Sequence, residues 1–338
     1  MIKRTLLSCL ILLILTACFS TWTDFKIDEN GIIKDYIPLK EALKTNLEIP
    51  QSINGIIVAG IADDLFKDKK ITSVTFPDSV TSIGVNTFYN NELTQIKLPP
   101  NLKIVSVGVF GKNKITSISI PDSVTLIEWG AFQKNKLITI STGKNTEEIE
   151  ILAFAENEIT SVTFGESLTT IGSFAFMDNQ IKFVDIPNSV THVGDAAFRN
   201  NKLESAALSN RMTIINSGTF SNNLLTSVNI PVNIIEIRKD AFSNNQIARI
   251  NMSYGIKSIG ENAFMNNKLS TVNIPESVTS IGENAFSDNQ LTEITLGSNV
   301  SLSEFHYSFS YDFDDFYNDS GKTAGTYVYS NNTWGFKQ

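Results

Sequence analysis

The strongest constraint on the fold of this chain is a phenylalanine that recurs at every twenty-second position. The series runs from Phe66 to Phe286, with eleven phenylalanines and no interruption. A fixed period of this length is typical of a solenoid, in which each repeat forms one coil and stacks on the next. We therefore expect one elongated repeat domain in this chain of 338 residues, and not two globular domains.

Other positions of the repeat keep the same register. An asparagine follows the phenylalanine after three residues in ten of the eleven copies, with Lys69 as the exception. A stretch such as residues 270–274 then alternates polar and apolar side chains before Pro275, which predicts one short strand that ends at the proline. We expect the phenylalanines to stack in the interior. The asparagines should be buried in a tight turn and bonded to backbone groups.

The ends of the repeat array differ from its centre. Residues 18–65 predict an N-terminal cap, residues 66–300 contain the eleven repeats, and residues 301–338 predict a C-terminal cap with a β-hairpin. The phenylalanines in the C-terminal cap no longer keep the period. Within the array, polar residues such as Thr146 and Ser209 replace apolar ones, which predicts local loosening of those coils.

The repeat resembles that of BspA-like, or treponemal-type, leucine-rich repeat proteins, whose units read roughly L-x-x-I-x-I-P-x-S-V-x-x-I-G-x-x-A-F-x-x-N. Residues 269–289 fit this pattern at nearly every position, and the resemblance extends over residues 66–300. It implies a right-handed leucine-rich repeat solenoid with one short parallel strand per coil, turns or short helical segments on the convex side, and a cap at each end. It also implies adhesion, because BspA-like proteins are associated with attachment to host matrix proteins such as fibronectin and fibrinogen, and to other cells.

The first residues form a second recognisable signal. Lys3 and Arg4 precede an apolar stretch, as in a secretory leader. Residues 15–18, with the sequence LTAC, resemble the lipobox of bacterial lipoproteins, which implies a signal peptide at residues 1–17 and a lipid on Cys18. Such a lipid would anchor the protein to a bilayer surface. The alternative is an ordinary signal peptide in which Cys18 is incidental.

Few side chains in the sequence could perform catalysis or hold a cofactor. There are only two histidines, His192 and His306, and the two cysteines, Cys9 and Cys18, both belong to the leader region. No Ser–His–acid pattern, metal-spaced cysteine pair or glycine-rich phosphate loop is present, so we expect no enzyme activity, no cofactor and no catalytic metal. The acidic residues 312–319 offer oxygen ligands for calcium, but a solvated cap surface is the favoured interpretation.

The charge of the chain bears on its partners. The net charge is −8, and no basic run alternates with aromatic residues. The sequence thus predicts no basic patch, and we do not expect nucleic-acid binding. Proteins are the expected partners, and no feature specifies an oligomeric state.

Two groups of apolar residues are candidates for binding a partner. The first is a row on the turn before the repeated phenylalanine in the early coils, at a position that later coils make polar. Its members are Val85, Val107, Trp129 and Ile151, with Leu152 and Phe174 at the next position. The second is Phe183, which we expect to be exposed among serines and threonines on the strand face. Exposed contiguous apolar residues usually mark an interaction surface, whereas a turn that bends inward, or a covering cap, would bury the row.

These features predict a lipid-anchored protein of the bacterial cell envelope, at the outer membrane or cell surface. It would mediate protein–protein interaction or adhesion through its repeat surface, with host matrix proteins or other cells as partners. Its membrane contact would be the N-terminal lipid. The alternative is a structural or scaffolding lipoprotein that binds the bacterium's own proteins or glycans.

Overall fold

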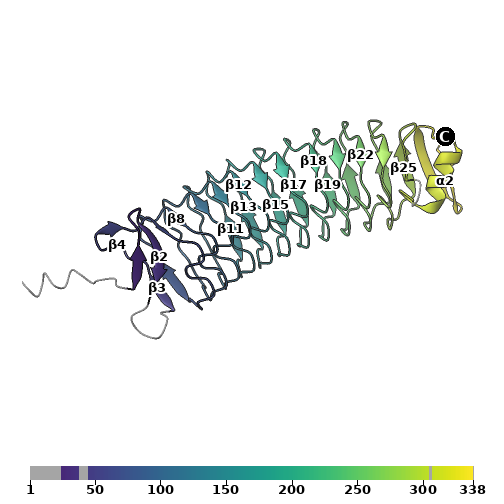
Figure 1. The fold of residues 1–338 in the computed structure, drawn as a ribbon. Helices are drawn as coiled ribbons and strands as arrows, with labels where there is room; N and C mark the ends of the chain where they lie inside the picture. Colours follow the sequence, from purple (N-terminus) through teal and green to yellow (C-terminus); the bar gives the residue numbers. More distant parts are fainter. Residues whose placement is uncertain (1–23, 38–44, 304–306, 338) are drawn as a thin grey trace, which may run out of the picture.

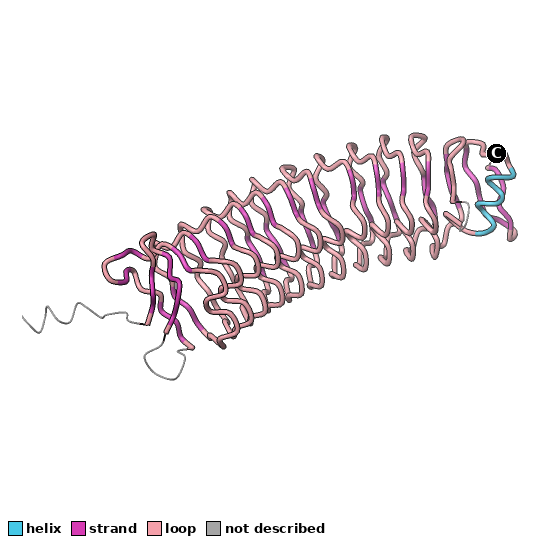
Figure 2. Tube along the Cα trace, in the orientation of Figure 1, coloured by secondary structure: helices cyan, strands magenta, loops and turns pink. Residues whose placement is uncertain are grey.

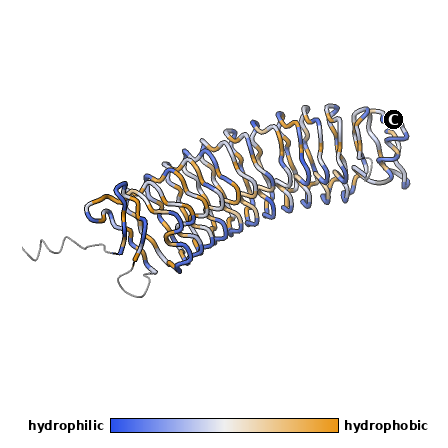
Figure 3. The backbone as a smooth tube through the Cα atoms, in the orientation of Figure 1, coloured by the Kyte–Doolittle hydropathy of each residue, from blue (hydrophilic) through white to orange (hydrophobic). Residues whose placement is uncertain are grey.

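The computed structural model describes residues 24–37, 45–303 and 307–337 and shows an elongated solenoid (Figure 1). The coils follow one another along a single axis, so that the fold is a parallel β-solenoid of about eleven turns. Most of each coil is loop, and the strands within it are short (Figure 2). Apolar and polar segments alternate along every coil (Figure 3), because the apolar side chains face the shared interior and the polar ones face solvent.

The strand expected before the proline is present in most coils and forms the first wall of the solenoid, although residues 95–97 and 117–119 form no strand. Its strands pair in parallel without a shift, as between Thr139 and Ser161 or between Phe183 and Ser205. The middle residue of each strand points into the core, and Ile140 is an example. The strands of this wall are β3 (Asn46–Glu48), β7 (Ser73–Thr75), β11 (Thr139–Ser141), β13 (Ser161–Thr163), β15 (Phe183–Asp185), β17 (Ser205–Ala207), β19 (Ser227–Asn229), β21 (Arg249–Asn251), β23 (Thr271–Asn273) and β25 (Glu293–Leu296).

The structure adds a second short strand per coil, which the sequence analysis did not predict. Each is only two residues long, too short for an alternation of polar and apolar residues to be recognised in the sequence. It forms because the adjacent coil supplies its partner, as where Glu148 pairs with Thr170. These strands are β6 (Gly60–Ile61), β8 (Ser82–Ile83), β9 (Ile104–Val105), β10 (Leu126–Ile127), β12 (Glu148–Ile149), β14 (Thr170–Ile171), β16 (His192–Val193), β18 (Ile214–Ile215), β20 (Glu236–Ile237), β22 (Ser258–Ile259) and β24 (Ser280–Ile281).

The repeated phenylalanines form one continuous stack through the interior, as expected. Neighbouring rings from Phe66 to Phe286 lie 5.3–5.8 Å apart between centroids, with at most 18° between their planes. Phe309 adds one more ring at 4.9 Å from Phe286, although it comes one residue late in the period. At the other end, the edge of Tyr36 meets Phe66 at 5.6 Å. Both caps therefore close the same aromatic column.

The buried asparagines link neighbouring coils, which confirms the structural role expected for them. Asn179 is typical, because its side-chain oxygen accepts the Ile159 N–H at 3.0 Å. Its amide donates to the carbonyls of Phe154 at 3.0 Å and Phe176 at 3.1 Å. Each asparagine thus satisfies backbone groups of two coils that no strand partner reaches.

The turn that contains the phenylalanine forms a third wall with its own backbone ladder. Gly130, Phe132 and Lys134 donate their N–H groups to the carbonyls of Ile151, Ala153 and Ala155 in the next coil, at 2.8–3.0 Å. This geometry requires a left-handed backbone two residues before and two residues after the phenylalanine in every coil. Such a conformation suits glycine, asparagine and aspartate, and it is strained for other residues.

The coils with polar replacements are not loosened, so this prediction is wrong. Thr146 and Ser209 are buried, and each hydroxyl donates to a carbonyl of the preceding coil, Val124 at 3.2 Å and Val190 at 2.6 Å. Because the hydroxyls replace core contacts with hydrogen bonds between coils, strands β11 and β17 continue through these repeats.

Additional strands extend the solenoid at its N-terminal end. An antiparallel hairpin pairs in parallel with β6 through its second strand, and a smaller hairpin follows β3. These strands are β1 (Phe25–Ile27), β2 (Ile32–Tyr36), β4 (Ser52–Ile53) and β5 (Ile56–Ile57).

The C-terminal end consists of helix α2 (Tyr311–Asp319) and the antiparallel strands β26 (Gly325–Ser330) and β27 (Thr333–Phe336). Strand β26 pairs with β25 and so covers the last strand edge of the first wall. Phe313 of α2 packs on Phe309 at 5.0 Å and on Trp334 at 4.9 Å between ring centroids. The helix thus joins the hairpin to the end of the phenylalanine stack.

Candidate interaction surface

The apolar row singled out in the sequence lies on the turn wall and is partly open to solvent. The side chains of Trp129 and Ile151 are 47% and 45% exposed, and those of Val85 and Val107 are half-buried. Neither an inward bend of the turn nor any described residue of the caps covers Trp129 and Ile151. They occupy the same position in adjacent coils, which lie roughly 4.8 Å apart, and so form a continuous apolar surface.

The backbone of this row is held by carboxylates that the sequence analysis overlooked. Glu150 accepts the Trp129 N–H at 2.9 Å, and Glu128 accepts the Val107 N–H at 3.0 Å. Several other coils carry glycine at the position of Glu128 and Glu150. Glutamate in place of glycine was the signal that the sequence offered. The glutamate carboxylate fixes the turn that presents Trp129.

Leu152 and Phe174 continue the apolar surface at the next position, and both are half-buried. Both have a left-handed backbone, with φ of 60° and 59°. Eight of the eleven coils carry glycine, asparagine or aspartate at this position. A larger side chain there costs roughly 1–2 kcal/mol. Strain of this kind clusters at functional sites, and we use the name apolar patch for Trp129, Ile151, Leu152 and Phe174.

The apolar patch borders a shallow hollow of about 310 Å³. Phe174 lines this hollow at one end, and Asp195, Arg199 and Lys239 contribute charged groups along it. An apolar surface beside a hollow with charges of both signs suits contact with a protein, which offers side chains of both kinds.

Phe183 lies apart from the apolar patch. It begins strand β15 on the first wall, and its side chain is 57% exposed, as expected from the sequence. The structure therefore brings four of the candidate residues together and leaves Phe183 alone. Cys18, the expected lipid attachment site, falls outside the described residues.

A second exposed apolar group was missed in the sequence. Tyr254 and Val232 are 79% and 63% exposed, and they occupy the same loop position in adjacent coils, with Ile235 nearby in the sequence. Other coils place polar residues such as Asn188 and Asn210 there, and that contrast was the signal. This second group lies several coils away from the apolar patch.

The described residues give little support for metal or acid–base chemistry. Within them, no three His, Cys, Asp or Glu side chains are grouped as a metal site would require, and His192 is exposed on β16. In the acidic stretch, Asp314 is buried and accepts the N–H groups of Ser308 and Phe309 at 2.5 and 3.1 Å. Burial raises the pKa of Asp314 to about 6, against the lowering effect of these hydrogen bonds. Its carboxylate therefore holds the C-terminal segment together and does not face solvent.

Comparison with known proteins agrees with the repeat geometry. The profile of the BspA type leucine rich repeat region matches residues 59–182, 147–269 and 235–332, which together cover well over half of the chain. The chain belongs to the BspA-type leucine-rich repeat family. Among the helices of the described residues, none has the length and apolarity needed to cross a membrane. No curated protein matches the sequence significantly.

Several solved structures of bacterial leucine-rich repeat proteins share the fold. A leucine-rich cell surface protein from Faecalibacterium prausnitzii has 24% identity and a TM-score of 0.54, over 82% of this chain and 87% of that one. A leucine-rich repeat protein from Bacteroides ovatus has 22% identity and a TM-score of 0.51, over 86% and 69%. The pneumococcal vaccine antigen PcpA has 18% identity and a TM-score of 0.51, over 84% and 83%. At these identities the likeness concerns the BspA-type fold alone.

Proposed function

We propose that this BspA-type protein is a lipid-anchored component of the bacterial cell envelope that binds other proteins through the apolar patch. One observation carries the proposal. Leu152 and Phe174 are large apolar residues at strained, left-handed positions where most coils carry glycine, asparagine or aspartate. Full burial does not offset this backbone strain, because both side chains remain half-exposed beside the exposed Trp129 and Ile151. Contact with a partner would complete that burial.

Adhesion to host matrix proteins or to other cells is the form of binding that we propose. The resemblance to BspA-like proteins suggests it, and one solved structure with this fold is described as a cell surface protein. A solenoid presents a long surface of stacked coils, and such surfaces suit binding to extended macromolecules. In this proposal the protein acts by contact alone and performs no reaction.

Substitutions in the apolar patch test the proposal. The double variant Trp129→Glu with Phe174→Asn introduces residues that other coils use at these two positions, so we expect the fold to be kept. Its affinity for immobilised fibronectin or fibrinogen, measured by surface plasmon resonance, should fall at least tenfold, or about 1.4 kcal/mol. Phe174→Asn should also raise the melting temperature slightly, because it removes backbone strain.

A control variant replaces two exposed apolar side chains elsewhere on the solenoid. The double variant Val232→Asn with Tyr254→Asn changes the second apolar group and should bind like the unchanged protein. Equal losses in both double variants would contradict a role specific to the apolar patch. If the unchanged protein binds neither fibronectin nor fibrinogen, the proposal of adhesion to host matrix proteins is wrong. The scaffolding alternative is then favoured.

Lipid anchoring through Cys18 has its own test. In a bacterial host fed a labelled fatty acid, the full chain should incorporate the label and sediment with membranes, because acylation holds a protein at a bilayer. Cys18→Ala should lose the label and most of the membrane association. Cys9→Ala, which changes the other cysteine of the leader region, should keep both. Complete membrane retention of unlabelled Cys18→Ala would refute the lipoprotein assignment.

A further inference from the structure

The first four coils gather lysines along one edge of the turn wall. Just after each repeated phenylalanine, these coils carry seven lysines but only two carboxylates, Asp68 and Glu92. This corrects the expectation that the chain has no basic patch. The lysines escaped notice because they fall into three short groups that lie about one or two repeats apart in the sequence. We use the name lysine edge for Lys67, Lys69, Lys70, Lys112, Lys114, Lys134 and Lys136.

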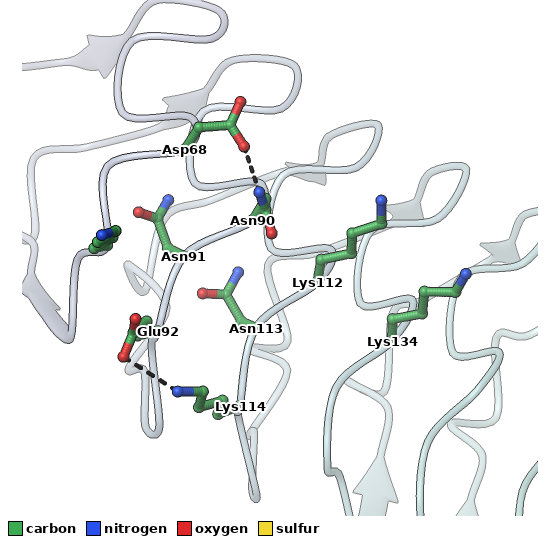
Figure 4. Close-up of a pocket in the computed structure, with 9 residues that line it drawn as sticks. Asp68, Asn90, Asn91, Glu92, Lys112, Asn113, Lys114 and Lys134 are labelled. Atoms are coloured by element: carbon green, nitrogen blue, oxygen red, sulfur yellow. Dashed lines mark hydrogen bonds and ion pairs between the residues drawn. The ribbon is translucent and has the colours of Figure 1, made fainter.

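The lysine edge surrounds a hollow in the surface. The hollow has a volume of about 480 Å³ and is lined by four of these lysines, by three asparagines and by the carboxylates Asp68 and Glu92. Figure 4 shows Lys112 and Lys134 side by side on one rim and Lys114 on the other, with Asn91 and Asn113 between them. Lys112 and Lys134 belong to successive coils, so their charges are spaced along the solenoid axis at roughly the 4.8 Å coil separation.

Much of this positive charge is available to a ligand. Lys114 pairs with Glu92 at 3.1 Å, and Lys134 pairs with Glu156 at 3.3 Å. Both pairs are well exposed, and exposed pairs of this kind exchange easily for other anions. In the described part of the chain, no carboxylate forms an ion pair with Lys112 or Lys136.

The position of Lys112 is fixed by an aromatic ring. Its ammonium nitrogen lies 5.2 Å from the centroid of the Tyr89 ring, and Lys67 approaches the same ring at 5.7 Å. The ring rests against Gly111 of the next coil, where an added Cβ would lie 3.0 Å from it. Glycine at this position therefore gives Tyr89 the space to hold the two cations.

Three of the lysines occupy strained backbone positions, and Lys70, with φ of 55°, is one of them. Lys112 and Lys134 are left-handed, with φ of 52° and 59°, at the second such position of the coil. Eight of the eleven coils carry asparagine or aspartate there. In several of them these side chains bond to one another, as where the Asn266 amide donates to Asn244 Oδ1 at 2.8 Å. Lysine at this position has a strained backbone and cannot form these side-chain hydrogen bonds between successive coils. Its presence therefore points to a role in binding.

We propose that the lysine edge binds an acidic polysaccharide, with sulfate or carboxylate groups spaced along an extended chain. The rows of ammonium groups match such a ligand in charge and direction, and the asparagines of the hollow suit its hydroxyl groups. No apolar side chain lines the hollow, so an acidic membrane surface is a poorer match. The site shares no residue with the apolar patch, and it therefore goes beyond the protein-binding function proposed above.

The test is titration of a labelled heparin oligosaccharide of defined length with the detergent-solubilised full chain, followed by fluorescence anisotropy. The double variant Lys112→Asn with Lys134→Asn should lower the affinity at least tenfold and keep or raise the melting temperature. The matched control, Lys202→Asn with Lys268→Asn, makes the same change of charge on the same wall in later coils. Its affinity should stay within twofold of the unchanged protein. Binding should also weaken with added salt.

Three results would overturn the proposal. One is equal loss of affinity in both double variants, which would show attraction by overall charge. Another is binding of a single-stranded oligonucleotide, or of detergent micelles with phosphatidylserine, as tight as that of heparin. The third is absence of heparin binding at low salt. The apolar-patch variant should bind heparin normally, so that failure of one proposal is distinguishable from failure of the other.

Discussion

Replacement of Phe176 by alanine is expected to lower the free energy of unfolding by about 3–5 kcal/mol. Phe176 is fully buried, and its ring stacks on Phe154 at 5.3 Å and on Phe198 at 5.5 Å between centroids. Alanine would leave a cavity in the middle of the aromatic column. Neighbouring coils could not close it, because backbone bonds such as Phe176 N–H to Ala197 O at 2.9 Å hold the turn wall at its spacing.

Urea denaturation followed by circular dichroism measures this effect. Phe183→Ala is the matched control, because it removes the same side chain from an exposed position on strand β15. It should change the free energy of unfolding by less than about 0.5 kcal/mol. A midpoint for Phe176→Ala close to that of Phe183→Ala would mean that the stack does not stabilise the fold. Since each coil contacts only its neighbours, the central cavity should also make unfolding less cooperative.

The second large effect is expected for Asn179→Ala. The asparagine is 2% exposed, so water cannot take its place, and alanine would leave the N–H of Ile159 without its partner. The carbonyls of Phe154 and Phe176 would each lose one of two amide donors and keep the other, which comes from Asn157 and Asn201 respectively. An unsatisfied buried group costs roughly 1–3 kcal/mol and a lost hydrogen bond about 0.5–1.5 kcal/mol. We expect a total loss of about 2–4 kcal/mol, because the turn can relax in part.

The control for this prediction is an asparagine with the same repeat spacing but on the surface. Asn251 donates to Asn229 Oδ1 at 2.8 Å on the exposed face of the first wall. Asn251→Ala should cost less than about 0.5 kcal/mol. If Asn179→Ala unfolds at the same urea concentration as Asn251→Ala, the link between coils would not depend on the side chain. Hydrogen exchange of the Ile159 amide would locate the loss in the variant.

Part of the candidate surface could be predicted from the sequence. Trp129 and Ile151 break a column that is polar in later coils, and Phe183 interrupts a run of small hydroxyl residues. Both departures are visible because each residue can be compared with the residues at the same repeat position in the other coils. The structure shows these three side chains at the surface, as the departures predict.

Other parts of the surface depend on backbone conformation, which the repeat pattern did not indicate by itself. Leu152 and Phe174 are unusual because they are large apolar residues at a position where φ is positive in every coil, and only the tertiary structure shows that φ. The role of Glu150 as a partner of the Trp129 N–H also needs the distance between two coils. The lysine edge needs the stacking that brings Lys112 and Lys134 onto one rim.

The sequence by itself determined the coil length, the number of coils, the buried phenylalanines and the structural role of the asparagines. It could do so because a strict period of 22 residues forces each residue type into one column of stacked coils. Only the tertiary structure decided the second strand of each coil, the left-handed turn positions and the surfaces made from neighbouring coils. The physical reason is that these features arise from hydrogen bonds and contacts between residues a full repeat apart, where local patterns carry no information on distance or φ.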